Sequence, residues 1–253
     1  MKFSKVILAA IIAVCASSAA MAQSWTGFYI GLNAGHAWAE SDVNTSTTLN
    51  AAGYLLASEV DAVNAAGTGR VKPSGFTGGL TLGYNWHFGH GFFGFEGDYN
   101  HFNSDDWRTV TFADPFCAGC TYTLRQNVEV SHLASIRMRG GWASAHWLIY
   151  GTAGAAHTKF NYSEVFTDTF GGAYESSWTT RSTGGFIWGA GAEVKFGKHW
   201  SLKGEYLTSH FSRLSGTGGT LTAYSPTVSF PDVLTHSADL SVDMARVGVN
   251  FKF

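Results

Sequence analysis

Apolar and polar residues alternate along the segment from Ala245 to Phe253. Its odd-numbered positions are apolar, whereas the positions between them hold Arg246, Gly248, Asn250 and Lys252. Successive side chains of a β-strand point to opposite faces, so this pattern predicts a strand with one greasy face and one charged or small-residue face. The same period-2 pattern recurs along the chain.

Seven further segments show this alternation or a variant of it. They span Trp25–Trp38, Gly75–Trp86, Phe92–Phe102, Val128–Trp142, His146–Phe160, Thr183–Phe196 and Trp200–Phe211. Each is long enough for a tilted strand to cross a bilayer. In 146–160 the facing stays open, because Leu148, Ile149 and Tyr150 are consecutive. Together with the terminal segment, these strands predict an all-β fold.

The connections between the eight segments alternate in length. They hold roughly 35, 5, 25, 4, 20, 3 and 25 residues, and long loops alternating with tight turns are typical of outer-membrane β-barrels. We therefore predict an eight-stranded antiparallel transmembrane β-barrel with long extracellular loops and short periplasmic turns.

The two faces of the predicted strands differ in charge. In a water-soluble barrel, which is the alternative fold, the inner face would be apolar and the outer face polar. Here the apolar face is continuous, and charges against lipid would cost about 2–4 kcal/mol each near the midplane. The opposite face is therefore predicted to point inward, and it carries Glu96, Asp98, Arg137, Arg139, Glu193, Lys195, Lys203, Glu205, Arg246 and Lys252.

Aromatic residues gather where the short turns are predicted. Tryptophan favours membrane interfaces, so a belt is expected at that end. Its predicted members are Trp25, Trp86, Trp142, Trp147 and Trp200, joined by Phe88, Phe92 and Phe253.

The first 22 residues have the pattern of an export signal. Lys2 and Lys5 precede an apolar run, and Ala20-Met21-Ala22 forms a small-x-small cleavage site. We expect residues 1–22 to be a signal peptide and 23–253 a single barrel domain. Lipid attachment at Cys15 is disfavoured, because Ala13-Val14 does not match the usual attachment motif.

The net charge is mildly negative. It is −2 for the full sequence, and removal of two lysines leaves 14 basic and 18 acidic residues, a formal charge of −4. Such a chain lacks the basic stripe that would attract nucleic acid.

Four motifs resemble one known family. They are Trp25–Gly31, Gly189–Glu193, Trp200–Tyr206 and Arg246–Phe253. In this order, after an export signal, they resemble the small porin-like, opacity-type outer-membrane β-barrels of Gram-negative bacteria, which include major immunogenic proteins. The resemblance implies residence in the outer membrane, contact with its lipid and lipopolysaccharide, and a terminal Phe253 that signals assembly to the barrel insertion machinery.

The inward charges have two interpretations. An eight-stranded cylinder is only wide enough for side chains to fill it. A mutually paired network that plugs the lumen is favoured, and a narrow ion path gated by rearranged pairs is the alternative.

Cys117 and Cys120 lie in a predicted loop of an exported chain. A redox-active pair of this spacing normally opens a helix in a βαβ context, which is not predicted here. A local disulfide is favoured over metal binding, for which a second ligand pair of suitable spacing is lacking.

His210 and Ser212 share the outward face of their predicted strand, and Asp239 could orient the imidazole. A lipid hydrolase needs such a trio, but a His-x-Ser pair is common by chance. We predict no enzymatic activity.

The ten histidines invite a metal or haem interpretation. His87, His90, His146 and His199 fall at the short turns, and we expect the other positions, His36, His101, His132, His157 and His236, not to form a spaced cluster. No cofactor is predicted, with haem capture by the loops kept as an alternative.

The predicted function is structural: envelope integrity and surface display through the loops. A small passive channel and a loop-mediated adhesin are the alternatives. The first loop bears an apolar stretch, 49–63, which suggests a short helix or a patch for a host or neighbouring surface protein.

Overall fold

The computed structural model describes residues 24–224 and 227–253. The predicted signal peptide, including Cys15, lies outside the described residues. Within these ranges, no helix is both long and apolar enough to cross a bilayer.

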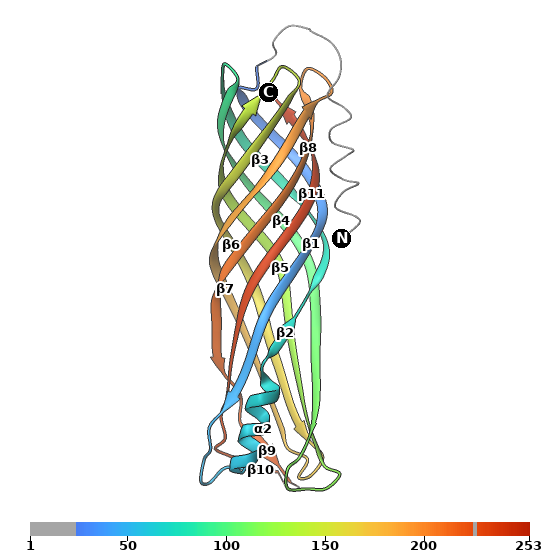
Figure 1. Cartoon of the computed structure of the whole chain (residues 1–253), viewed down its shortest axis with the longest axis vertical. Helices are drawn as coiled ribbons and strands as arrows, with labels where there is room; N and C mark the ends of the chain where they lie inside the picture. The colour runs from blue at the N-terminus through green and yellow to red at the C-terminus, as the bar shows by residue number, and fades with distance from the viewer. Residues whose placement is uncertain (1–23, 225–226) are drawn as a thin grey trace.

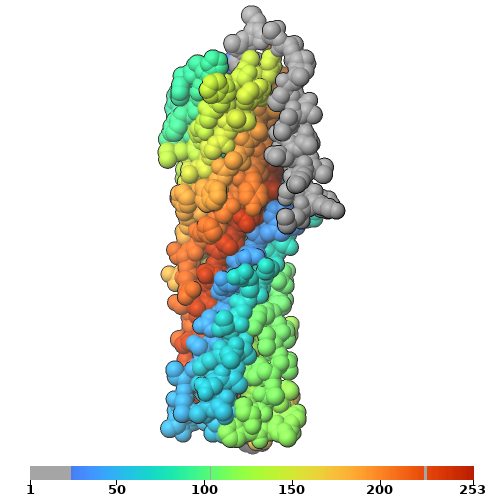
Figure 2. All heavy atoms as spheres, in the orientation of Figure 1, coloured from blue at the N-terminus to red at the C-terminus, as the bar shows by residue number. Residues whose placement is uncertain are grey.

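Eight long strands pair in sequence order into one closed antiparallel ring. They are β1 (Gly27–Thr47), β3 (Ser74–Phe88), β4 (Gly91–Ala113), β5 (Thr121–Ala143), β6 (Trp147–Asp168), β7 (Tyr174–Lys195), β8 (Trp200–Thr217) and β11 (Leu234–Lys252). The ring closes where β11 pairs with β1. The result is a long cylinder of tilted strands (Figures 1 and 2).

The register fixes the tilt of these strands. Following paired residues once round the ring leads from Ala37 through Met244, Leu207, Gly189, Thr152, Arg139, Gly94 and Asn85 to Gly27. The path therefore returns to β1 ten residues from its start (37 − 27). A stagger of this size over eight strands corresponds to a tilt of about 40°, so each residue rises about 2.5 Å along the axis.

The two ends of the cylinder differ. The short-turn end joins strands through residues 89–90, 144–146 and 196–199. The loop end carries α2 (Ala57–Gly67), β2 (Gly69–Val71), β9 (Leu221–Ala223) and β10 (Val228–Phe230) (Figure 1). A short helix is one interpretation of the apolar stretch 49–63, and α2 begins within this stretch.

The strands are much longer than the sequence pattern predicts. β4 and β5 have 23 residues each, and β6 and β7 have 22. The expected loops of about 25 and 20 residues shrink to residues 114–120 and 169–173. The missing length lies in strands that continue toward the loop end.

A reversal of polarity explains the misjudged length. Near the short-turn end the outer wall is apolar, and on β1 it exposes Phe28, Ile30 and Leu32. We call this zone the apolar band; its other large members include Leu80, Leu82, Phe93, Phe95, Ile136, Met138, Ile149, Phe186, Trp188, Leu202 and Val247. Farther along β1, polar residues such as Asp42 face outward and Val43 is buried. The loop-end half therefore has the polarity of a water-soluble barrel.

The interior is filled in tiers. At the short-turn end Trp25, Phe92, Ala143, Leu148 and Tyr150 form a buried cluster, which we call the aromatic seal. Charged side chains come next, then an apolar core that includes Phe102, Phe160 and Leu207. A further apolar cluster at the loop end packs against Val60 and Val63 of α2.

Two predictions about facing need revision, and one open question is answered. Trp25 and Phe92 are not belt residues, because both are buried in the aromatic seal. Leu148 and Tyr150 point inward whereas Ile149 points outward, which settles the facing of β6.

Gly154 should be needed for closure of the ring. It faces inward opposite Arg137, and an added Cβ would lie 2.1 Å from the carbonyl oxygen of Ile136. Overpacking costs about 1–3 kcal/mol. We expect Gly154→Ala to lower the free energy of unfolding by that amount, measured by urea titration in detergent micelles. Gly204→Ala is the control, because its Cβ would meet nothing within 4 Å; equal losses in both variants would contradict this account.

Candidate functional site

Eight charged side chains meet inside the cylinder. The interior charge network consists of Glu96, Asp98, Glu193 and Glu205 with Arg137, Arg139, Lys203 and Arg246. None of these residues is more than 7% exposed. Four acids face four bases, so the network has no formal net charge. Alternation places each of them inward, because their sequence neighbours belong to the outer wall or are glycine.

Glu96 of β4 is the centre of the network. Its carboxylate accepts hydrogen bonds from Arg137 at 2.5 Å and from Arg139 and Lys203 at 2.9 Å each. Tyr29 donates its hydroxyl to the same carboxylate at 2.7 Å. One carboxylate thus holds residues of β1, β5 and β8 together across the lumen.

Arg246 joins β11 to the network. Its guanidinium lies 3.0 Å from Asp98 of β4 and 2.8 Å from Glu205 of β8. Arg137 also reaches Asp98, at 2.7 Å. The Arg246–Asp98 contact bridges β11 and β4, which do not neighbour one another in the ring, whereas the other two contacts join paired strands.

Neutral groups complete the ionic contacts. Tyr150 donates to Glu205 at 2.6 Å, and Ser135 donates to Asp98 at 2.8 Å. Glu193 pairs with Arg139 at 2.9 Å and accepts from Asn250 at 2.9 Å. Charge-assisted hydrogen bonds of this kind are the strong ones.

Arg139 joins the network to the aromatic seal. Its guanidinium carbon lies 4.2 Å from the Tyr150 ring centroid and 5.4 Å from those of Tyr29 and Phe92. Cation–π contacts gain strength where water is excluded. The charged tier therefore rests directly on the apolar closure of the short-turn end.

Lys195 and Lys252 are not part of this cluster. Both ammonium groups lie at the short-turn mouth, where they donate to the backbone carbonyl of Ser24 at 3.4 and 2.6 Å. Lys195 also stands 4.2 Å from the Trp25 ring centroid. The ion pairs above thus join four acids to four bases, and the two further lysines of the predicted set lie at the mouth. The reason is that both face the interior so close to the strand ends that their long side chains reach the mouth.

The candidate hydrolase residues are not assembled. His210 is exposed on the outer wall, opposite Ser241 of β11. Asp239 lies 3.8 Å from Arg213 and accepts a hydrogen bond from the Asp42 N–H, so its carboxylate is directed away from an orienting role for His210. A β-bulge between Phe211 and Leu214 shifts the register here.

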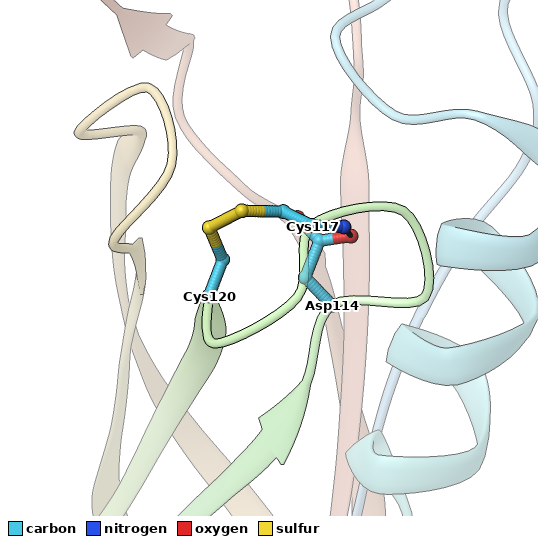
Figure 3. Close-up of side chains that lie close together, drawn as sticks. All are labelled: Asp114, Cys117 and Cys120. Carbon is cyan, nitrogen blue, oxygen red and sulfur yellow. Dashed lines mark hydrogen bonds between the residues drawn. A yellow bond between two sulfur atoms is a disulfide. The ribbon is translucent and has the colours of Figure 1, made fainter.

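Cys117 and Cys120 form a disulfide in the turn between β4 and β5 (Figure 3). Asp114 lies beside them, and its carboxylate accepts from the Phe116 N–H at 2.7 Å. Because the two sulfurs are joined, they do not offer thiolates to a metal. The turn supports the predicted disulfide.

The loop end contains buried carboxyl groups that sequence reasoning missed. Glu164 of β6 accepts hydrogen bonds from Tyr162 and Thr45. Glu175 of β7 is only 2% exposed. Burial raises the pKa of Glu164, and burial together with the nearby Glu164 raises the pKa of Glu175 to about 8. The alternation of Tyr162, Glu164 and Phe166 is the signal that could have revealed them.

Phe253 lies at the short-turn end of β11. Its side chain is 72% exposed, and its N–H donates to the carbonyl oxygen of Phe28 at 3.1 Å. The terminal residue is thus tied to the ring while its aromatic ring stays accessible.

Comparison with known proteins identifies the family. A model described as the outer membrane protein beta-barrel domain matches residues 6–253, so the chain belongs to this family and is an outer-membrane protein. It is 27% identical over 267 residues to the 31 kDa outer-membrane immunogenic protein of Brucella melitensis biotype 1, with 98% of this chain and 99% of the relative covered. The protein of the same name from Brucella suis biovar 1 gives the same values.

Two solved structures of outer-membrane proteins are similar to the chain over most of its length. OprG from Pseudomonas aeruginosa has a TM-score of 0.46 at 14% identity, covering 92% of this chain and all of OprG. The attachment invasion locus protein Ail of Yersinia pestis has a TM-score of 0.33 at 17% identity, covering 90% of this chain and all of Ail.

Removal of one network cation should destabilise the protein strongly. Arg246→Met leaves Asp98 and Glu205 short of a partner, and breaking a buried pair costs about 3–5 kcal/mol. Urea unfolding in micelles measures the loss. Arg213→Met is the matched control, because the Arg213 side chain is 67% exposed and lies 3.8 Å from Asp239; this change should cost less than about 1 kcal/mol. A loss below that value for Arg246→Met would contradict the account.

The raised pKa of Glu175 predicts a pH dependence of stability. The unfolded carboxyl ionises near pH 4.5 and the folded one near pH 8, so the unfolded state binds fewer protons between these values. Glu175 should therefore contribute a fall in the free energy of unfolding as pH rises from about 4.5 to 8. Glu175→Gln should flatten this slope, whereas Asp239→Asn, which changes an exposed carboxylate, should not. An unchanged slope in Glu175→Gln would refute the assignment.

Proposed function

We propose that this member of the outer-membrane β-barrel family is a closed, non-conducting barrel with a structural role. It spans the outer membrane through its apolar band, with the short-turn end in the periplasm and the loop end outside. Its role is to contribute to envelope integrity and to display the loop-end surface. We propose no enzymatic activity.

The dimensions of the apolar band support this placement. After correction for the stagger of the ring, Trp86, Trp142 and Trp200 lie within about one residue step of Gly27 along the axis. The polar outer wall begins about ten steps farther on, which at about 2.5 Å per step gives a band of about 25 Å. Membrane-spanning barrels have an apolar band of this height, bordered by aromatic girdles.

The charge network carries the proposal that the barrel does not conduct. Its charges balance, each member is buried, and the aromatic seal closes the lumen below it. An open path would require several of these pairs to separate, which leaves uncompensated buried charges. A gated path is therefore the less favoured alternative.

The loop-end surface supports a display role. Trp178, Phe116 and Phe170 are 73%, 65% and 60% exposed beyond the apolar band. Exposed aromatic residues are typical of binding surfaces. Surface display also agrees with the name of the Brucella relatives, which describes them as immunogenic. Adhesion to a host or neighbouring protein, or capture of a ligand such as haem, is the alternative that this surface favours.

The accessible Phe253 supports a role in assembly. We propose that the barrel insertion machinery recognises its exposed ring at the periplasmic end. The residue is suited to this because it extends the last strand without packing into the lumen.

Single-channel recording tests the non-conducting proposal. The refolded mature chain in planar bilayers should give no steady conductance, because the lumen is filled. A large porin reconstituted in the same bilayers serves as the positive control. Reproducible open events would favour the channel alternative.

Loop exchange tests the display proposal. Replacing residues 48–73 and 218–233 by short turns should abolish binding to any surface ligand and leave heat-modifiable gel migration intact. The opposite pattern, in which ligand binding persists without these segments, would argue against loop-end display.

A further inference from the structure

Five histidines lie on the outer wall of five different strands. They are His36 of β1, His101 of β4, His132 of β5, His157 of β6 and His210 of β8. Each alternates with buried, inward-facing residues, such as Ala37, Phe102 and Leu133. We call these five residues the histidine girdle.

The register places the girdle at one height. The register is staggered by ten residues over eight strands. Residues at the same height on neighbouring strands are therefore offset from directly paired residues by about one and a quarter positions. With this correction the five histidines fall between about 9 and 11 residue steps above Gly27. At about 2.5 Å per step, they lie within about 5 Å of one another along the axis. The cross-strand register, and not spacing in the sequence, thus brings His36, His101, His132 and His157 to the height of His210, whereas His236 is buried.

This height is the loop-side border of the apolar band. On four of the strands we compared the girdle histidine with the next outward residue toward the short-turn end. These residues are Ala34, Tyr99, Ala134 and Ala155. One outward position toward the loop end, β6 carries Lys159, which is exposed. In the proposed orientation, this border meets the headgroups of the outer leaflet.

Three girdle members form a continuous row. His101 is paired directly with His132, and the His132 and His157 rings are 6.5 Å apart. Lys159 is paired with His132. Tyr99 stacks on His132, and the Ser131 hydroxyl lies 3.1 Å from His132 Nδ1. Like charges so close together favour an anion among them.

The nearby carboxylates are already engaged. Glu129 of β5 accepts from Asn161, and Glu40 of β1 pairs with Lys72 and Arg70. On the far side, Asp243 accepts from Thr208, which precedes His210 on the same outer face. Asp239 faces Arg213. His36 packs on Trp38 and Phe76, so its neighbours are aromatic.

A shared metal ion fits these residues less well than an anion. Among the described residues, the only group of three candidate ligands within 4.8 Å of one another is Asp114, Cys117 and Cys120. The imidazoles are instead spread along the wall. A protonated imidazole carries a positive charge, so acid favours a cationic row.

We propose that the histidine girdle is a docking surface for the phosphorylated headgroups of outer-leaflet lipid, strengthened at acidic pH. The occupant follows from continuity with the lipid-facing band and from the charge of the protonated row. The proposal rests on the membrane span given under Proposed function. A cation beside an anionic surface changes the binding constant by about fivefold.

Lipid retention in nanodiscs tests the proposal. The mature chain is refolded into phosphatidylcholine nanodiscs containing bisphosphorylated or dephosphorylated lipid A, with EDTA present, at pH 5.5 and 7.5. Native mass spectrometry then counts the lipid A molecules retained per barrel. We expect about fivefold stronger retention of the bisphosphorylated form for each imidazole that gains a proton and meets a phosphate.

Matched variants identify the residues responsible. Substituting all five girdle histidines by glutamine should remove the pH response, whereas His→Gln changes at His87, His90, His146 and His199 should preserve it. The pair His132→Gln and His157→Gln should reduce it without disturbing the other strands.

Several results would overturn the proposal. These are an unchanged pH response in the five-residue variant, equal retention of dephosphorylated lipid A, or release of the lipid by millimolar inorganic phosphate. Heat-modifiable migration of the same samples separates the two claims. A chain that fails to insert refutes the membrane span, whereas an inserted chain without a pH response refutes only the girdle.

Discussion

The rest of the structure depends on pairing the charged side chains that are buried inside the barrel. Removing a charged group from water costs several kcal/mol, which is recovered only when partners and hydrogen bonds surround it. Glu96 finds its partners on β5, β8 and β1, and Arg246 finds its own on β4 and β8. Because β4 is far from β8 and β11 in the sequence, the network is satisfied only when the whole ring has closed. Ring closure and charge pairing therefore support each other, and an open sheet would leave both its edges and its charges unmet.

The same strands are also exposed to two solvents, lipid near the short-turn end and water near the loop end. Near the short-turn end they are apolar outside and ionic inside, as lipid requires. Beyond the girdle the polarity reverses, and residues such as Val43 and Phe160 fill an apolar core while polar groups face water. The reversal lets one continuous cylinder extend past the membrane without a separate domain. The reversal also defines a sharp border between the lipid-facing and the water-facing parts of the outer wall. The five outward histidines lie at this border.

Much of this architecture follows from alternation alone. Period 2 predicts the eight strands, the ring order and the inward facing of Glu96 and Arg137, because lipid penalises any other choice. Alternation predicts the face to which a side chain points but not how far the side chain extends. It therefore does not show that Lys195 ends at the mouth or that Trp25 turns into the lumen. Strand length was underestimated because the reversed pattern looks like loop sequence. The girdle could not be predicted, since its members become neighbours only through the cross-strand register.

The central claim is that lipid bathes the outer wall up to the girdle and water bathes it beyond. Nitroxide scanning along the outward positions of β1 tests this most directly, by comparing collisions with oxygen, which partitions into lipid, and with a water-soluble nickel complex. The account predicts that labels at Ile30, Leu32 and Ala34 respond to oxygen, and that labels at Asp42 and Ser46 respond to nickel. Equal nickel accessibility at all five positions would contradict it.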